Sequence, residues 1–517
     1  MNGAHSLLAT LRANEVTTIF TNPGTTEVDL MAALDSFDDV HAVLCLFEGV
    51  ATGAADGFAR VTGRASATLV HLGPGLSNGW ANLHNARRAH SPIVNIVGDH
   101  PDAHRLLDPP LNSDLEGLTQ SLGGWFRRIV DADDVADLTA GAVGACYGPP
   151  GRSSTLLLPS NVAWSDVAAP PHWPVARRET APAPSSQDVV HAARSLRTRR
   201  SAIFIGGDAV SGAQLALAQR VCAATSSRLI METFPAIFEH GAGIVSPERL
   251  IYLSDFALGQ LSDLEVIVLI GATVPAPPFA YRRGPDQIVA QGCDVIDLAP
   301  PGVDTFAALD SLVNELDAPP VSIPSGSPAE VPPGPLDSHA LALAIASTIP
   351  EGLIISDESN TSGLHLYGAT QWSNRHRVMT LTGNAIGFGL PATLGAASAK
   401  QGRVLAIEAD GSMMYTLQAL WTMAHEGLDV TVLALSNRSY AIVELELRRV
   451  HQPLERSSSQ LLVDLDDPAL DLAGIARGLG VPSVRVETTQ ELLDALLRSY
   501  STPGPMFIEA ILPHGIG

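Results

Sequence analysis

The clearest pattern of apolar and polar positions lies in the last third of the chain. Residues 403–409 and 430–435 are short apolar runs typical of buried strands, and residues 413–426 between them have helical length and spacing. Such a βαβ unit collects ligands beyond the carboxyl ends of its parallel strands, where Asp410 and Asn437 fall and where backbone N–H groups face the same crevice. Because carboxylate and amide oxygens suit Mg²⁺, the pattern predicts a magnesium and phosphate site. An ordinary turn with a capping Asp is the alternative.

A second strand-to-helix junction, near the start of the chain, carries an isolated acidic residue. Residues 43–47 are apolar and predict a buried strand that delivers Glu48 to its end, and the small residues 49–60 predict a helix after it. Glu48 is therefore expected where a strand meets a helix in a mostly apolar setting, and a simple helix cap is one interpretation of it.

Two stretches rich in Pro, Ala and Ser divide the chain, which at 517 residues is too long for one core. Residues 165–186 and 316–335 are predicted to be extended linkers. The predicted domains are residues 1–165, 187–315 and 336–517, each a doubly wound parallel α/β sheet. In the middle domain, apolar runs at 202–207 and 266–271 end in glycine without a Gly-x-Gly-x-x-Gly motif, so we expect tight turns rather than a nucleotide site.

Charge and cysteine content narrow the possible partners and the compartment. The net charge of −23 disfavours nucleic acid and anionic membrane surfaces as partners. The cysteines are far apart, without paired metal-ligand spacing, and are predicted to be reduced: Cys45, Cys146, Cys222 and Cys293. With no apparent signal peptide and no apolar run of membrane-spanning length, we expect a soluble cytoplasmic protein.

Further motifs occur in a specific order along the chain. They are Asn-Pro-Gly-Thr-Thr-Glu at 22–27, Ala-Asp-Gly-Phe-Ala-Arg at 55–60, Gly-Pro-Gly-Leu-Ser-Asn at 73–78 and Gly-Phe-Gly-Leu-Pro-Ala at 387–392, before Asp410-Gly-Ser and Asn437. In this order they resemble the thiamine-diphosphate (ThDP) enzymes of the acetolactate synthase, benzoylformate decarboxylase and pyruvate decarboxylase group. Over nearly the whole chain the sequence is most similar to actinobacterial acetolactate synthase-like proteins. The resemblance implies pyrimidine-binding, central and diphosphate-binding domains, in that order.

The resemblance also implies a role for each matching residue. Glu48 would donate to N1′ of the cofactor's aminopyrimidine, Ile386 would support the bent cofactor, and the backbone carbonyl of Asn384 would contact the 4′-amino group. The implied magnesium ligands are Asp410, Asn437 and the carbonyl of Ser439. The implied diphosphate contacts are Asn360, Thr361, Ser412 and Met413, and further cofactor contacts are Pro23, Gly24, Asn78, Gly411 and Tyr440.

Substrate recognition is implied at two more positions. His71 and Thr25 match an active-site histidine and a carboxylate-binding serine of benzoylformate decarboxylase. His71 could handle a proton or bind a carboxylate, or it could be a packed imidazole bonded to backbone. The second active-site histidine of that decarboxylase has no counterpart in residues 271–279. His100 and His104 are either pocket residues or surface-loop residues.

These expectations define a function with two alternatives. The leading interpretation is a ThDP- and Mg²⁺-dependent, acetolactate synthase-like carboligase that decarboxylates a 2-oxo acid, without FAD. The first alternative is a simple 2-oxo-acid decarboxylase. The second is a non-catalytic paralogue, motivated by Asn384, Ala409 and Ser436, where relatives carry Gly, Gly and Asn. The resemblance further implies an active site shared between two subunits, hence a homodimer or a dimer of dimers.

Overall fold

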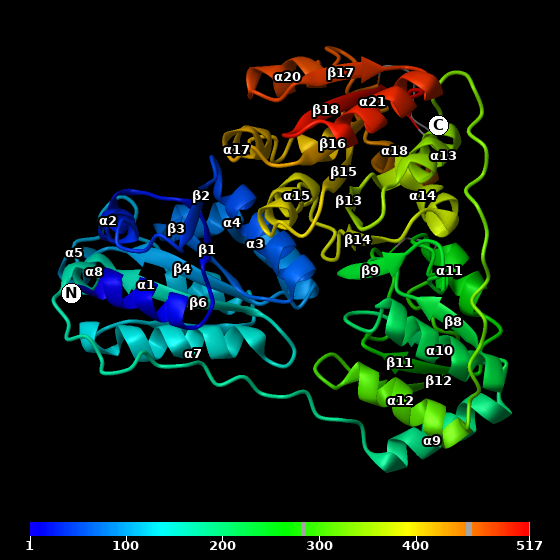
Figure 1. Cartoon of the computed structure of the whole chain (residues 1–517), viewed down its shortest axis with the longest axis horizontal. Coiled ribbons are helices and arrows are strands. Elements are labelled where there is room, and N and C mark those ends of the chain that lie inside the picture. Colours follow the sequence, from blue (N-terminus) through cyan, green and yellow to red (C-terminus); the bar gives the residue numbers. More distant parts are fainter. Residues whose placement is uncertain (281–284, 451–456, 516–517) are drawn as a thin grey trace. The chain divides into compact units, whose positions relative to one another are not determined.

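The structure, a computed structural model, describes residues 1–280, 285–450 and 457–515. Three sheets of mainly parallel strands alternate with helices along the chain (Figure 1), which confirms the predicted α/β class with three doubly wound sheets. The two predicted linkers contain neither a helix nor a strand within residues 165–185 and 317–337. None of the helices in these described ranges is long and apolar enough to cross a membrane.

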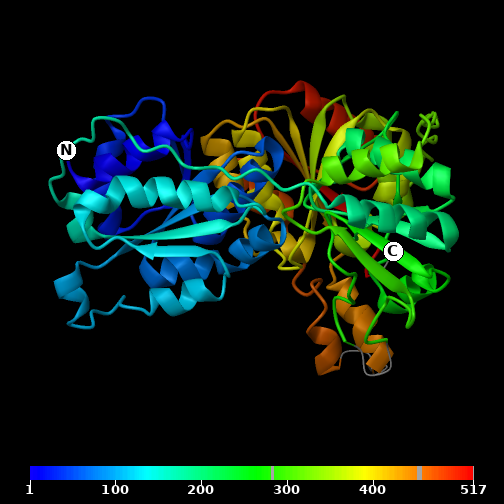
Figure 2. The same ribbon diagram turned by 90° about the horizontal axis from the view of Figure 1, so that it is seen from below.

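The first sheet has six parallel strands in the order β2-β1-β3-β4-β6-β5. Its strands are β1 (Thr18–Asn22), β2 (His41–Leu44), β3 (Ser66–His71), β4 (Ile93–Asp99), β5 (Trp125–Arg128) and β6 (Ser153–Pro159). Its helices are α1 (Gly3–Ala13), α2 (Val28–Leu34), α3 (Glu48–Thr62), α4 (Leu72–Arg88), α5 (Asp102–Arg105), α6 (Leu115–Gln120), α7 (Val135–Tyr147) and α8 (Ser160–Trp164). β4 and β6 are buried at every position, as expected for parallel strands with helices on both faces (Figure 2).

One sequence-based boundary in this sheet is wrong. The strand predicted over residues 43–47 ends at Leu44, after which only the N–H of Cys45 still bonds to the neighbouring strand, at Thr21 O. Phe47 is the N-cap of α3, so Glu48 occupies the first position of a helix rather than the end of a strand. The edge position of β2 explains the early end, because only one neighbouring strand holds it.

The second sheet has five parallel strands in the order β10-β8-β7-β11-β12. They are β7 (Ser201–Ile205), β8 (Arg228–Met231), β10 (Glu248–Arg249), β11 (Val266–Ile270) and β12 (Asp294–Ala299), with α9 (Ser186–Thr198), α10 (Gly212–Thr225), α11 (Ser254–Leu261) and α12 (Thr305–Leu316). Gly207 and Gly271, which follow β7 and β11, both have positive φ, and a Cβ at either would collide with the backbone of the other turn. The tight turns predicted there are confirmed.

The third sheet contains the parallel order β17-β18-β16-β15-β13. These strands are β13 (Leu353–Glu358), β15 (Val404–Ala409), β16 (Val430–Ser436), β17 (Ser483–Val486) and β18 (Met506–Ile511). The helices are α13 (Ser338–Thr348), α14 (Leu366–Ala369), α15 (Gly389–Ser398), α16 (Asp410–Met413), α17 (Ala419–His425), α18 (Ala441–Val450), α19 (Ser458–Leu461), α20 (Leu472–Gly478) and α21 (Thr489–Ser501). Separately, β9 (Ile237–His240) pairs antiparallel with β14 (His376–Thr380).

The single helix predicted over residues 413–426 is instead two short helices, α16 and α17, joined by turns. Thr416, in the connecting turns, donates its hydroxyl to Gly387 O at 3.1 Å. A contact with a distant segment therefore interrupts the helix that the local pattern predicts.

Chain contacts group the molecule into two compact units. The first unit is residues 1–178, 328–373 and 381–517, and the second is residues 179–327 and 374–380. The first and third sheets thus share one unit, while the three predicted domain boundaries stay a prediction. Within the first unit, α3 and α15 approach so closely that a Cβ at Gly57 would collide with Ala392 O, and one at Gly395 with Ala54 O.

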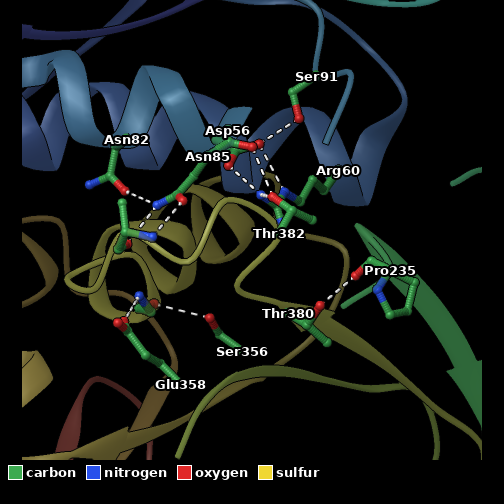
Figure 3. A network of polar contacts seen from close by, with 12 residues as sticks. Asp56, Arg60, Asn82, Asn85, Ser91, Pro235, Ser356, Glu358, Thr380 and Thr382 are labelled. Atoms are coloured by element: carbon green, nitrogen blue, oxygen red, sulfur yellow. Dashed lines mark hydrogen bonds and ion pairs between the residues drawn. The ribbon is translucent and has the colours of Figure 1, made fainter. Parts of the chain in front are cut away.

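A buried ion pair reinforces this approach (Figure 3). Arg60 binds both carboxylate oxygens of Asp56, at 2.8 and 2.6 Å, and both side chains are almost completely buried. Ser91 donates to Asp56 at 2.5 Å, and Arg60 also donates to Thr382 Oγ1 at 3.0 Å. The guanidinium of Arg60 lies 4.3 Å from the ring centre of Phe388. The pair therefore ties the first sheet's helix to the segment that precedes α15.

Replacing Asp56 with Asn should leave the buried Arg60 without its counter-charge. The free energy of unfolding is expected to fall by about 3–5 kcal/mol, the usual cost of breaking one side of a buried pair. The midpoint of urea unfolding, followed by intrinsic fluorescence, measures this. Asp39→Asn, which removes the exposed pair with Arg12, is the matched control and should have no measurable effect. Equal midpoints for the two variants would contradict the assignment.

Candidate active site

Glu48 is the first residue of α3, and its side chain contacts α4. It is 7% exposed, and its Oε2 accepts a hydrogen bond from Asn78 Nδ2 at 3.0 Å. Gly75 lies beside it in the first turn of α4, where a Cβ would come within 3.2 Å of Glu48 Oε1. The missing side chain at Gly75 keeps this side of the carboxyl group open.

Side chains of α4 hydrogen-bond to residues 383–387, the loop that precedes α15. Asn82 donates to Gly387 O at 3.1 Å and to Gly49 O at 2.8 Å, so it connects this segment to the residue after Glu48. Asn85 donates to Ala385 O at 2.8 Å, and His84 bonds to Gly383 O at 3.1 Å. The carbonyls of Gly383, Ala385 and Gly387 are thereby all hydrogen-bonded. Figure 3 shows Asn82 and Asn85, which also bond to each other.

The carbonyls of Asn384 and Ile386 are not used in this way. Across the described ranges, neither accepts a hydrogen bond from the protein. Asn384 is exposed and Ile386 is half-buried. Asn384 and Ile386, the two residues predicted to contact a cofactor, thus lie in a segment whose other carbonyls are hydrogen-bonded to α4.

Backbone strain marks the same region. Four non-glycine residues at its turns have positive φ: Leu72 (53°), Asn360 (50°), Asn384 (56°) and Arg438 (55°). Such conformations cost free energy and concentrate at functional sites. Leu72 and Arg438 were not identified from sequence, because neither residue type signals a left-handed backbone.

The predicted metal ligands converge at the ends of β15 and β16. Asp410 accepts the backbone N–H groups of Gly411 at 2.8 Å and of Arg438 at 2.6 Å. Asn437 Oδ1 accepts the N–H of Ser439 at 3.2 Å. Burial raises the pKa of Asp410 to about 6, although the N–H donors oppose this shift. A cation placed here would favour the charged carboxylate, and these hard oxygen donors suit Mg²⁺.

The predicted phosphate contacts lie next to these ligands. Asn360 Nδ2 donates to Ser412 Oγ at 2.8 Å, and a small cavity is lined in part by Thr361, Ser362 and Asn437. The ring of Tyr440 packs over Gly411, where a Cβ would collide with it. Met413 is fully buried at the start of the turns that reach Gly387 through Thr416.

His71 ends β3 and is oriented by Glu27. Its Nδ1 lies 2.8 Å from Glu27 Oε2 and 3.0 Å from Thr26 Oγ1. The buried Glu27 carboxylate also accepts Gly24 N–H at 2.7 Å and a short bond from the Thr26 hydroxyl. Gly98 makes room for it, because a Cβ there would collide with Glu27 Oε1. Sequence reasoning gave Glu27 no role, since its partner is 44 residues away.

The predicted residues therefore form connected groups rather than isolated positions. Asn82 joins Gly49, which follows Glu48, to Gly387, which follows Ile386. Gly387 is bonded in turn by Thr416, in the turns that follow Met413. Thr25 is exposed and Pro23 half-exposed, and their side chains make no hydrogen bond within the part of the chain that is described. All these contacts join the first and third sheets within one chain. The predicted need for a second subunit is not explained by them and stays a prediction.

A second buried acidic group lies beneath the same segment and was missed from sequence. Glu358, which Figure 3 labels, accepts N–H groups from Gly387 at 2.7 Å and from Gly389 at 2.6 Å. Glu408 lies against Gly389, and in the described ranges neither of its carboxyl oxygens has a hydrogen-bond partner. Burial raises the pKa of both glutamates, and their mutual repulsion raises that of Glu408 further. Neither Glu358 nor Glu408 was identified from sequence, because each lies in a strand whose other positions are mainly apolar.

Comparison with known proteins is decisive at this point. Two family models match: the N-terminal TPP binding domain of thiamine pyrophosphate enzymes over residues 1–121, and their C-terminal TPP binding domain over residues 362–510. A Mycobacterium tuberculosis protein, IlvX, whose name provisionally assigns it as an acetolactate synthase large subunit, is 44% identical over 523 aligned residues that cover 100% of both chains. The chain belongs to the thiamine pyrophosphate enzyme family.

More distant relatives of this thiamine pyrophosphate enzyme agree. The benzoylformate decarboxylase of Pseudomonas aeruginosa is 27% identical, with 96% of each chain covered. The crystal structure of benzoylformate decarboxylase from Polynucleobacter necessarius superposes with a TM-score of 0.85 at 20% identity over 99% of each chain, which supports the fold alone. The predicted family and its three-sheet fold are confirmed.

The two buried carboxyl groups of Glu358 and Glu408 should make the stability of the protein depend on pH. An unfolded Glu loses its proton near its ordinary pKa of 4.5, whereas the raised pKa keeps folded Glu408 protonated to higher pH. The folded state then binds more protons, so stability falls as pH rises above about 4.5.

Glu408→Gln cannot ionise and should therefore lose this cost. The variant is expected to unfold at a temperature at least about 2 °C above wild type at pH 8, with the gain shrinking towards pH 4.5. Thermal unfolding of the cofactor-free protein at both pH values measures it. The exposed Glu330→Gln should show no gain at either pH. A gain that does not change with pH would rule out ionisation of Glu408 as the cause.

Proposed function

We propose that this protein is a ThDP- and Mg²⁺-dependent enzyme that releases CO₂ from a 2-oxo acid and passes the remaining acyl unit to a second carbonyl compound, as an acetolactate synthase does. The observation that carries the proposal is the Asn82 bridge, which joins the Glu48 region to residues 383–387 and leaves the Asn384 carbonyl available. The name of the 44% identical relative supports the carboligation.

The chain offers a suitable donor set for both parts of the cofactor. Asp410, Asn437 and the Ser439 carbonyl would hold Mg²⁺, and Ser412, Met413, Asn360 and Thr361 would hold the diphosphate. Pro23, Gly24, Asn78, Gly411 and Tyr440 are the further contacts. When bound, ThDP supplies a nucleophilic carbon that can accept the 2-oxo acid.

The protein's own contribution is proton handling and orientation. Asn78 occupies Glu48 Oε2, so Oε1 is the atom that holds the exchanged proton. Burial of Glu48 beside the small residues of α4 excludes water from that proton. Ile386 and the Asn384 carbonyl then fix the orientation of the ring that receives it.

Simple decarboxylation is a second candidate, and the pairing of His71 with Glu27 favours it. The Glu27 carboxylate holds His71 Nδ1, so His71 Nε2 is directed away from that bond and can carry a proton. Such a group suits protonation of the reacting carbon after CO₂ leaves. Thr25, at the same turn, would contact the substrate carboxylate.

FAD is not part of the proposal. In the second sheet, Glu232 Oε1 accepts Gly207 N–H at 2.7 Å and Glu239 Oε2 accepts Gly212 N–H at 3.1 Å. These amides lie after β7 and at the start of α10, where a parallel sheet ordinarily binds a nucleotide phosphate. Two carboxylates occupy them and would repel an anionic ligand.

Product analysis with pyruvate or benzoylformate tests the function. With ThDP and Mg²⁺ we expect CO₂ together with acetolactate or acetoin from pyruvate, lost after EDTA treatment and restored by Mg²⁺. Glu48→Gln should lower turnover about 100-fold or more, while the exposed Glu15→Gln should match wild type. An aldehyde as the only organic product would replace carboligation by simple decarboxylation. Undiminished turnover in Glu48→Gln, or no CO₂ from any 2-oxo acid, would reject the proposal.

We further propose a homodimer or a dimer of dimers with the active site at the subunit interface. Large apolar side chains stay exposed in the first unit, among them Leu106, Leu107, Leu364 and Leu462 at 72–84% exposure. Exposed apolar groups of this size favour a covering partner. Sedimentation velocity should show a species of at least twice the 54.2 kDa chain mass. A fully active monomer would contradict it.

A further inference from the structure

His100 follows β4 directly, beside the strand that ends in His71. β3 and β4 are parallel, and His71 is in register with Gly98. His100 therefore lies only two residues beyond the level of His71, at the carboxyl edge of the first sheet. In parallel sheets this edge is where ligands bind.

The ring of His100 has an unsatisfied polar atom. Its Nε2 is buried and, in the ranges that the structure describes, has no hydrogen-bond partner. His104 packs against it with ring centres 5.3 Å apart and planes at 67°. Buried polar groups in native proteins are almost always hydrogen-bonded, so such an atom calls for a ligand.

His71 presents a matching nitrogen. Its Nδ1 is held by Glu27 and Thr26, and no described residue bonds to its Nε2. Because the Glu27 carboxylate accepts from Nδ1–H, His71 carries a second N–H, on Nε2, in its imidazolium form. That N–H and the N–H of His100 can each donate to one oxygen of a carboxylate.

The protonation of His100 agrees with a role as a neutral donor. Burial lowers its pKa, the Asp99 carboxylate opposes this shift, and the charges of His104 and His71 lower the pKa further. Asp99 also accepts the backbone N–H of His100 and pairs with Arg128, which limits its influence on the ring. At neutral pH the ring carries one N–H, which can donate to an anion.

We propose that His100 Nε2 hydrogen-bonds the carboxylate of the 2-oxo acid together with His71, and that His100 thereby determines which 2-oxo acids the site accepts. The proposal rests on the proposed function, because it assumes a 2-oxo acid as substrate. It replaces the interpretation of His100 as a surface-loop residue and leaves His104 as a packing neighbour.

Two substitutions separate hydrogen bonding from ring packing. His100→Phe keeps a flat ring but removes the N–H, and His100→Gln keeps an N–H donor of similar reach. For the 2-oxo acid that wild type turns over, His100→Phe should raise KM about 10- to 100-fold, and His100→Gln should recover much of the loss. The dissociation constant of ThDP, measured by fluorescence quenching, should stay unchanged in both. The exposed His172→Ala is the control and should behave as wild type.

Three results would overturn the inference. The first is an unchanged KM in His100→Phe. The second is an equal rise of KM in both variants, and the third is a parallel loss of ThDP affinity or thermal stability, since either would indicate a packing role. Glu48→Gln, assayed alongside, distinguishes these from failure of the proposed function. If Glu48→Gln is inactive while His100→Phe keeps the wild-type KM, only the role of His100 is wrong, whereas full activity of Glu48→Gln rejects the function itself.

Discussion

The close approach of α3 and α15 is the constraint on which the rest of the site depends. Gly57 and Gly395 let the two backbones touch, and the buried pair of Asp56 and Arg60 fixes the contact at one end. Only with the helices this close can Asn82 and Asn85 of α4 reach the carbonyls of residues 385–387. A larger residue at either glycine would separate the helices and, with them, the Glu48 region from the segment that carries Ile386.

Several buried carboxyl groups lie around this contact, and they differ in how their negative charge is stabilised or avoided. Glu27, Glu48 and Asp410 accept N–H donors from nearby side chains or backbone. Glu358 binds two amides of the turn before α15, whereas Glu408 has no donor among the described residues. Because an unpaired buried carboxylate is costly, Glu408 is best accommodated as a neutral acid. Acidic residues of this chain thus also lie in its interior, where hydrogen bonds or protonation offset the cost of burying a carboxylate.

The substrate side of the site is less determined by the family than the cofactor side. The proposed metal and phosphate ligands come from backbone turns and short polar residues, and the donor atoms lie on neighbours of Ala409 and Ser436 rather than on these two residues. Of the histidines at the edge of the first sheet, His71 is the last residue of β3, whereas His100 lies in the loop after β4, where a side chain can change without altering the strands. This difference explains why the cofactor is easier to propose than the 2-oxo acid.

The sequence by itself determined the three α/β sheets, the strands β7, β11, β15 and β16, and the residues at the ends of β15 and β16, because these follow from local apolar patterns and short motifs. It misplaced the end of β2 and the helix over residues 413–426, where Thr416 is held by Gly387. It also missed Glu27, Glu358 and Glu408. Only the tertiary structure decided that Glu27 orients His71, that Asn82 joins Gly49 to Gly387, and that β4, which precedes His100, lies beside β3, which His71 ends. These are contacts between residues far apart in the chain, and no local pattern of hydrophobicity or turn chemistry encodes them.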